Sequence, residues 1–421
     1  MVKNLTLRIG RFGLVLSALV LTVPAFAQEL RGVLTVSTHR VDLLQAGDYA
    51  RWIKGFERLH PKVKVHISGV SDYKTIFTRR LAHNDVADVM TVPPDTPLHF
   101  LRRYFVPMRL LNEEELYFSD KWRGVDGHYA YPRGVVVDGL LYNKILLKKA
   151  QYEPPRNAQA LHEVCVAVSQ LSAGTAGLDK IGLSLNIGAG WPLQHVDKAM
   201  LAASGNGAYL NSLSRRQQPF AREQVAHAVL VLLRRLYDAE CTDGLALTDT
   251  WTESLMRFER SIGFMLTGSW VIPELIKLGS REDDLGFIPP PFYESRADRV
   301  VIESDWGLAI SNTSKQQKLA KAWVAYLLSL PDYAATQGLL PSLSSTEIAL
   351  APLRELMALA TEVIEFQPLS PELVQLSAIA EIDFMRGDYI RQLLISSDAL
   401  QTMDYFNWRW QQARDVATGR R

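Results

Sequence analysis

The chain of 421 residues has 46 Lys and Arg against 45 Asp and Glu. This balance argues against a nucleic-acid-binding protein, which would usually need a basic face. Because one hydrophobic core rarely extends beyond about 250–300 residues, the length predicts two lobes. The two cysteines, Cys165 and Cys241, are too few for a disulfide framework, and the sequence leaves open whether they pair or remain free thiols.

The first 27 residues are typical of a secretory signal peptide. Lys3, Arg8 and Arg11 precede an apolar stretch that reaches Val23, and an Ala-Phe-Ala cleavage pattern ends at Ala27. The apolar stretch is short of the roughly 18 residues that a transmembrane helix needs. Without these three basic residues the chain has 43 basic and 45 acidic residues, a formal charge of −2. The sequence therefore predicts a soluble, exported protein, most simply of a bacterial periplasm.

The region that follows alternates between short strands and amphipathic helices. Strands are predicted over residues 32–37, 62–68 and 88–92, and helices over residues 46–60 and 73–83. This β-α-β-α-β order predicts a mostly parallel sheet, in which ligands gather at the carboxyl ends of the strands.

Two extended passages divide the rest of the chain. They cover residues 130–144 and 285–291, and the segment between them is mainly helical. Further elements are strands over 181–187, 262–266, 300–302 and 306–311, and helices over 161–171, 222–237, 316–330 and, with breaks, 344–417.

The stretch 263–270 combines a buried strand, a Gly-Ser turn and a tryptophan. Gly268 allows a close backbone approach, and Ser269 is predicted to cap a helix over residues 272–278. The N-terminus of that helix would offer free backbone N–H groups. Beside them, Trp270 could seat a polar, ring-shaped ligand. The alternative is a simple strand-to-helix turn with a core tryptophan.

Five local patterns follow one another in order. They are a helix, Phe-Glu-x-x-His-Pro and strand element (52–65), an Asp-Val strand (87–90), a Gly-Leu-x-Tyr-Asn-Lys crossing element (139–144), the Gly-Ser-Trp turn (263–270) and a return strand before a Lys-rich helix (305–310). Together they resemble extracellular solute-binding proteins of ABC importers, of the large carbohydrate-binding type. The resemblance covers nearly the whole chain after residue 27.

This resemblance implies an α/β, periplasmic-binding-protein-like fold with two lobes, a hinge and an interlobe cleft. The expected first lobe comprises residues 28–137 and 288–340, and the helix-rich second lobe residues 138–287 and 341–421. Such a protein, expected as a monomer, would close on a sugar or sugar derivative and deliver it to an inner-membrane permease. No cofactor, metal or nucleic acid is expected.

Candidate ligand residues of the return and turn elements follow from the resemblance and from sugar chemistry, since sugars need flat rings and fixed polar groups. Trp270 and Trp191 are candidates for stacking, although Trp191 could instead pack on Pro192. Gly268 and Ser269 are candidates for backbone and hydroxyl contacts. Trp306 stands where relatives more often have glycine, so it lines the cleft or fills a gap in the core.

The exit of the first strand carries His39, Arg40 and Asp42, where relatives often have a tryptophan or small polar residues. Arg40 could bind a carboxylate or phosphate, which would favour an anionic ligand, or pair with Asp42 at the surface. Tyr73 and Asp95, at the ends of first-lobe elements, are further ligand candidates.

Catalytic patterns are missing from the sequence. It has no His-Glu-x-x-His and no Gly-x-Ser-x-Gly, and Cys165 and Cys241 lack the spacing of metal ligands. The sequence therefore predicts a non-enzymatic binding protein. Two alternatives stay open: a sensory protein that presents its ligand-bound form to a receptor kinase, and a secreted glycoside hydrolase with two carboxylates across a cleft.

Overall fold

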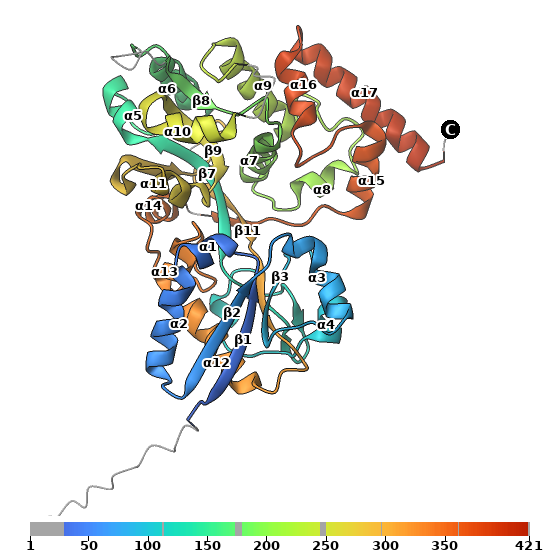
Figure 1. Cartoon of the computed structure of the whole chain (residues 1–421). Coiled ribbons are helices and arrows are strands. Elements are labelled where there is room, and N and C mark those ends of the chain that lie inside the picture. Colours follow the sequence, from blue (N-terminus) through green and yellow to red (C-terminus); the bar gives the residue numbers. More distant parts are fainter. Residues whose placement is uncertain are drawn as a thin grey trace, which may run out of the picture.

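The computed structural model describes residues 29–111, 113–172, 179–244, 250–295, 297–360 and 362–419. It has two lobes, each built on its own β-sheet with helices packed around it (Figure 1). The predicted two-lobed α/β fold is confirmed. The predicted signal peptide lies outside the described residues. Among the helices of the described part, none is long and apolar enough to cross a membrane.

The first lobe contains a five-stranded sheet in the order β2-β1-β3-β12-β6. β1 pairs in parallel with β2 and β3, and β12 runs antiparallel to β3, so the predicted β-α-β-α-β start is confirmed. Its helices bury one apolar face each; α2, for example, buries Tyr49, Trp52 and Phe56. The elements are β1 (Gly32–Thr38), α1 (Val41–Gln45), α2 (Asp48–Leu59), β2 (Val63–Gly69), α3 (Tyr73–Ala82), β3 (Val89–Val92), α4 (Leu98–Tyr104), β4 (Arg123–Gly124), β5 (Gly127–His128), β6 (Tyr131–Pro132), β12 (Gly307–Ile310), α12 (Gln317–Ser329) and α13 (Pro331–Ala335).

The second lobe contains a six-stranded sheet in the order β13-β11-β7-β9-β8, with β10 also paired to β7. More helices surround this sheet than the first one (Figure 1). The strands are β7 (Val135–Asn143), β8 (Ile181–Ser184), β9 (Ile262–Gly268), β10 (Leu285–Ile288), β11 (Arg299–Ser304) and β13 (Glu362–Glu365). The helices are α5 (Lys144–Ala150), α6 (Ala158–Ser169), α7 (Gln194–Ser204), α8 (Tyr209–Leu213), α9 (Val225–Asp238), α10 (Trp251–Ser261), α11 (Val271–Lys277), α14 (Ala351–Leu359), α15 (Pro371–Ala380), α16 (Asp388–Ile395) and α17 (Ala399–Ala417).

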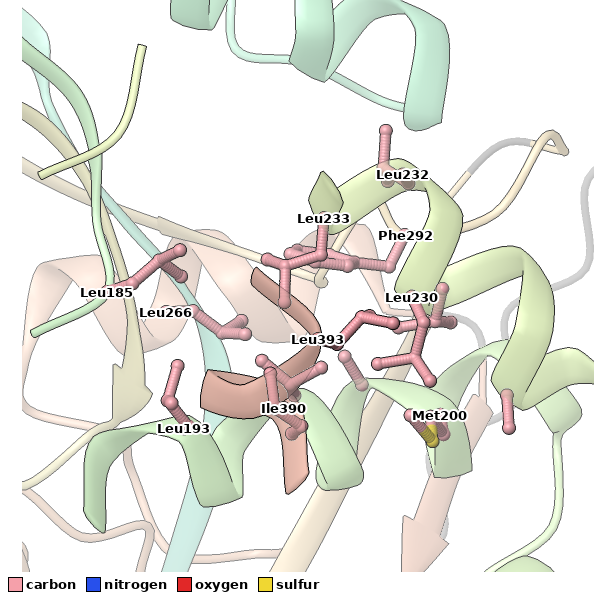
Figure 2. Close-up of a cluster of buried hydrophobic side chains, with 14 of the residues drawn as sticks. Leu185, Leu193, Met200, Leu230, Leu232, Leu233, Leu266, Phe292, Ile390 and Leu393 are labelled. Atoms are coloured by element: carbon pink, nitrogen blue, oxygen red, sulfur yellow. The ribbon is translucent and has the colours of Figure 1, made fainter. Parts of the chain in front are cut away.

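The core of the second lobe forms where α7, α9 and α16 converge (Figure 2). Met200, Leu233 and Leu393 are fully buried there, one from each helix. A disulfide between Cys165 of α6 and Cys241, just beyond α9, ties two of the covering segments together, with their Cα atoms 5.7 Å apart. The question that the sequence left open for these cysteines is thereby answered: they pair.

The chain crosses between the lobes three times, the last time between α13 of the first lobe and α14 of the second. β6 ends at Pro132 and β7 begins at Val135, close to the predicted exit near residue 137. The return of the chain to the first lobe was predicted near residue 288. The structure places it later, because β10 and β11 both pair with β7 in the second sheet. The chain therefore re-enters the first lobe between Ser304 and Gly307, and the boundary expected at residue 288 was too early. The extended segment over 285–291 looked like a crossing, but its first half is β10, which pairs with β7 in the second sheet.

Candidate functional site

Three tryptophans form a cluster on the second lobe. Trp191 opens the turn after β8, Trp251 begins α10, and Trp270 follows β9. The ring centroids lie 4.9 Å apart for Trp191 and Trp251, 5.4 Å for Trp251 and Trp270, and 6.1 Å for Trp191 and Trp270. All three side chains are partly exposed. The cluster thus offers aromatic surface at the strand ends of the sheet, where α/β folds bind ligands.

Local hydrogen bonds and one glycine fix the cluster. The side-chain oxygen of Asn186 accepts hydrogen bonds from Thr250 and Ser254, at 3.0 and 2.9 Å, which holds the start of α10 against the end of β8. Gly268 lies under the Trp270 indole, and a Cβ there would come within 2.4 Å of its Nε1 atom. The absence of a side chain at Gly268 therefore allows the Trp270 ring to lie in this position.

Ser269 has a different role from the predicted ones. It is fully buried, its N–H donates to the Val137 carbonyl at 2.8 Å, and its hydroxyl accepts from the Val137 N–H at 3.1 Å. The following helix has no side-chain cap. The prediction that Ser269 caps this helix is wrong, and its hydroxyl is engaged with β7 instead of facing outward.

On the first lobe, His39 stacks on Trp306. The ring centroids lie 3.8 Å apart and the planes differ by 16°. Tyr73 meets the Trp306 ring edge-on at 5.9 Å and is itself 2% exposed. Trp306 and His39 remain partly exposed. Tyr73 therefore supports this aromatic pair from behind, and the pair, rather than Tyr73, forms the surface.

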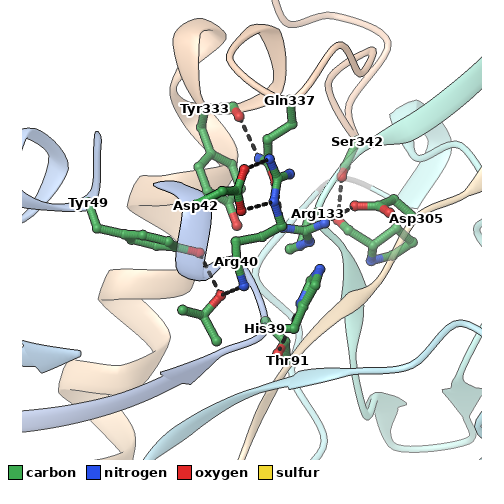
Figure 3. Close-up of polar contacts among 12 residues, drawn as sticks. His39, Arg40, Asp42, Tyr49, Thr91, Arg133, Asp305, Tyr333, Gln337 and Ser342 are labelled. Atoms are coloured by element: carbon green, nitrogen blue, oxygen red, sulfur yellow. Dashed lines mark hydrogen bonds and ion pairs between the residues drawn. The ribbon is translucent and has the colours of Figure 1, made fainter. Parts of the chain in front are cut away.

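Two arginines of the first lobe share one glutamine (Figure 3). Arg40 donates to both carboxylate oxygens of Asp42, at 2.8 and 2.6 Å, and to Gln337 at 3.0 Å. Arg133 donates to the same Gln337 oxygen and to Asp305. Of the two alternatives for Arg40, the structure shows the pairing with Asp42. The charges of this network therefore satisfy each other.

Protonation in this network follows from burial and the two arginines. Burial, and the positive charges of Arg133 and Arg40, lower the pKa of His39 to about 2, so this ring is neutral at physiological pH. Burial alone would lower the pKa of Arg133, but the Asp305 carboxylate outweighs it and raises that pKa. For the carboxylate of Asp42, burial alone would raise the pKa, but the hydrogen bonds from Arg40 lower it below its ordinary value.

The second lobe has its own set of paired charges. Asp138 of β7 contacts His195 at 2.6 Å and Lys198 at 3.0 Å, and Lys198 also reaches Glu303 at 2.8 Å. Burial opposes ionisation of Asp138, but Lys198 and His195 lower its pKa below the usual value. These groups are paired with one another, and Lys198 is shared by two carboxylates.

A cavity of about 740 Å³ lies between the lobes. The first lobe contributes residues 94–98 and 118–122 to its lining, and the second lobe residues 303–304 and 365–369. Asp95 is one of the lining residues, and its carboxylate forms an exposed ion pair with Lys74 at 2.9 Å. Among the described residues, no group of three or more His, Cys, Asp and Glu is placed to hold a metal ion.

The predicted residues thus fall into separate groups. Trp191 and Trp270 lie together over Gly268, and His39 and Trp306 lie together on the other lobe. Sequence reasoning missed Trp251, whose neighbours are remote in the chain, and Arg133, which was read only as part of an extended run. A cationic residue inside an otherwise apolar crossing strand was the available signal for Arg133.

The family model for bacterial extracellular solute-binding proteins matches residues 44–332 of the chain. The match covers more than half of the sequence and includes Trp191, Trp251, Trp270 and Trp306, while His39 precedes it. The chain belongs to this family of solute-binding proteins.

Individual relatives are more distant. The multiple sugar-binding protein of Streptococcus mutans serotype c is 24% identical over 289 residues, which span 65% of this chain and 66% of that protein. A manno-oligosaccharide-specific solute-binding protein of Bifidobacterium animalis subsp. lactis, solved with mannotriose, is similar with a TM-score of 0.70 at 19% identity, covering 92% and 95% of the two chains. The sugar-binding protein MalE of Xanthomonas citri is similar with a TM-score of 0.65 at 16% identity, covering 92% and 98%. At these identities the structures establish the shared fold.

Proposed function

We propose that the protein captures a neutral sugar or oligosaccharide between its lobes and delivers it to an inner-membrane ABC permease from the periplasm. The observation that carries the proposal is the partly exposed aromatic surface at the strand ends of both sheets, Trp191, Trp251 and Trp270 on one lobe and Trp306 with His39 on the other. Aromatic faces bind the apolar faces of sugar rings.

The paired charges support a neutral solute. Arg40, the group that could have selected an anion, is held by Asp42 and Gln337, and Arg133 is held by Asp305. Recruiting either arginine to a ligand anion would require breaking an existing ion pair. The sugar ligands of the relatives in Streptococcus and Bifidobacterium support the same solute class.

A thermal-shift screen tests the proposal. Purified protein is heated with a panel of mono-, di-, tri- and tetrasaccharides and, separately, with uronic acids and sugar phosphates. A neutral sugar that binds only the folded state should raise the melting temperature by several degrees at a concentration of about 100 Kd. A shift by the anionic compounds alone would contradict the neutral-solute proposal. Hydrolysis of a chromogenic glycoside without any shift would favour the hydrolase alternative.

A further inference from the structure

Three crossings of the chain join the lobes. The first crossing is residues 133–134, between β6 and β7; the second is residues 305–306, between β11 and β12; the third is residues 336–350, between α13 and α14. A motion of one lobe against the other has to be absorbed in these segments, because hinges are a few residues between rigid bodies. The bonds that hold the crossings to one another therefore limit how far the lobes can move.

Backbone hydrogen bonds join the first crossing to both of the others. The Asp305 N–H donates to the Gly134 carbonyl at 3.1 Å, which links it to the second crossing. Val135, directly after the first crossing, exchanges two hydrogen bonds of 3.0 Å with Leu340 of the third. A Cβ atom at Gly134 would come within 2.6 Å of the Leu340 carbonyl oxygen, so no side chain fits between these segments.

One buried guanidinium connects all three crossings (Figure 3). Arg133 belongs to the first crossing, and it donates to Asp305 of the second and to Gln337 of the third. Its side chain is 2% exposed, so water has little access to these bonds. A planar guanidinium makes two such bonds at once in fixed directions, whereas a lysine ammonium is a single point of charge.

The third crossing also touches the strand-end surfaces of both lobes. Gly338, next to Gln337, has a positive φ of 70°, and a Cβ atom there would come within 2.6 Å of the Ser269 carbonyl oxygen and of the Trp270 Cα atom. On the first lobe, Arg40 at the exit of β1 donates to the same Gln337 oxygen at 3.0 Å. A shift of the third crossing would therefore displace its contacts with Trp270 and with Arg40.

We propose that Arg133 is a positioning residue that binds the three crossings into one unit and thereby holds the two lobes within a narrow range of relative orientations. Without its guanidinium the backbone bonds between the crossings remain, but the second and third crossings lose their common partner and can shift separately. The inference concerns the protein without solute and goes beyond the proposed function.

Double electron–electron resonance on the solute-free protein tests this role, so the result does not depend on whether or which solute binds. The native cysteines are paired with each other and buried, which leaves introduced cysteines for the spin labels. Two label pairs have one exposed position on each lobe. They are Lys54→Cys on α2 with Lys149→Cys on α5, and Arg79→Cys on α3 with Glu372→Cys on α15.

Wild type should give one narrow distance for each pair. Arg133→Met should add a second distance in about 10% of the molecules or more, because a lost constraint raises the population of minor states. Arg133→Lys should lie between the two. Gln337→Met keeps the pair of Arg133 with Asp305 and releases only the third crossing, so it should broaden both distances less than Arg133→Met does.

Arg80→Met is the matched control, because Arg80 bonds to Asp85 and Ser37 within the first lobe. It should keep both distances of wild type. Melting temperatures show which variants are folded, and Gln337→Met decides the test where Arg133→Met does not fold. Wild-type distances in the folded Arg133→Met and Gln337→Met proteins would overturn the proposal. An equal broadening in Arg80→Met would overturn it as well, since the loss of any buried arginine contact would then have the same effect.

Discussion

The two lobes prepare their facing surfaces in different ways. On the first lobe, Arg40, Asp42, Gln337, Arg133 and Asp305 form a closed network that uses its charges internally (Figure 3). On the second lobe, three indole rings present aromatic surface, and the paired charges are a separate, buried group.

Under the proposed function, this difference would let a polar boundary select a neutral ligand. Charges that are bonded to each other set the shape of the first lobe, because each fixes the rotamer of its partner. In the proposed site, the aromatic rings would attract the apolar face of a ring-shaped solute, which does not require the solute to be charged. The network is thus expected to matter for stability and the tryptophans for binding.

The largest effect is expected from breaking the buried part of the network. Asp305→Ala leaves Arg133, which is 2% exposed, without its carboxylate, and should lower the free energy of unfolding by about 3–5 kcal/mol. Asp42→Ala is the control, because the Arg40–Asp42 pair is half-exposed and should cost about 1 kcal/mol or less. Urea unfolding measures both. Equal losses of unfolding free energy in the two variants would show that burial does not make the Arg133–Asp305 pair more important than the Arg40–Asp42 pair.

The disulfide should stabilise the second lobe alone. Replacing Cys165 and Cys241 together by alanine should lower the free energy of unfolding of that lobe by about 2–4 kcal/mol, because the link closes a long loop of the unfolded chain. Hydrogen exchange resolved by segment would show faster opening around α6 and α9 and little change in β1 to β3. Uniform acceleration in both lobes would indicate that they unfold as one unit.

His39 gives the network a dependence on pH. Its pKa is about 2 in the folded protein and 6.5 as the ordinary value, so between these limits the unfolded chain binds more protons. The free energy of unfolding should therefore fall as the pH drops below 6.5. Relative to wild type, His39→Gln should remove about 1–2 kcal/mol of that loss between pH 6.5 and 4.5. The exposed His83→Gln should leave the profile unchanged; a His39→Gln profile that also matches wild type would contradict this account.

The sequence was sufficient for the periodic elements and insufficient for long-range pairing. Strands such as β1 and β9 were predicted because their apolar residues are contiguous, and the Gly268-Trp270 turn because glycine and tryptophan are locally informative. Ser269 was misread because its partner, Val137, lies 132 positions away. The boundary at residue 288 failed for the same reason, since an extended segment looks alike whether it crosses or pairs.

The site was predicted in the same partial way. Trp191 and Trp270 could be proposed from their turns, whereas Trp251 is brought to them by the fold, in which Asn186 holds the start of α10. The pairing of Arg40 could be posed as an alternative from its spacing to Asp42. The role of Gln337, almost 300 positions away, could not.

The central claim is that the tryptophan cluster binds the solute, and calorimetric titration of Trp270→Ala tests it most directly. The sugar that shifts the melting temperature of wild type is the titrant, and Trp408→Ala, at a 56% exposed position on α17, is the control. Trp270→Ala should bind at least about tenfold more weakly while remaining folded, and Trp408→Ala should bind like wild type. Unchanged affinity of a folded Trp270→Ala protein would contradict the account.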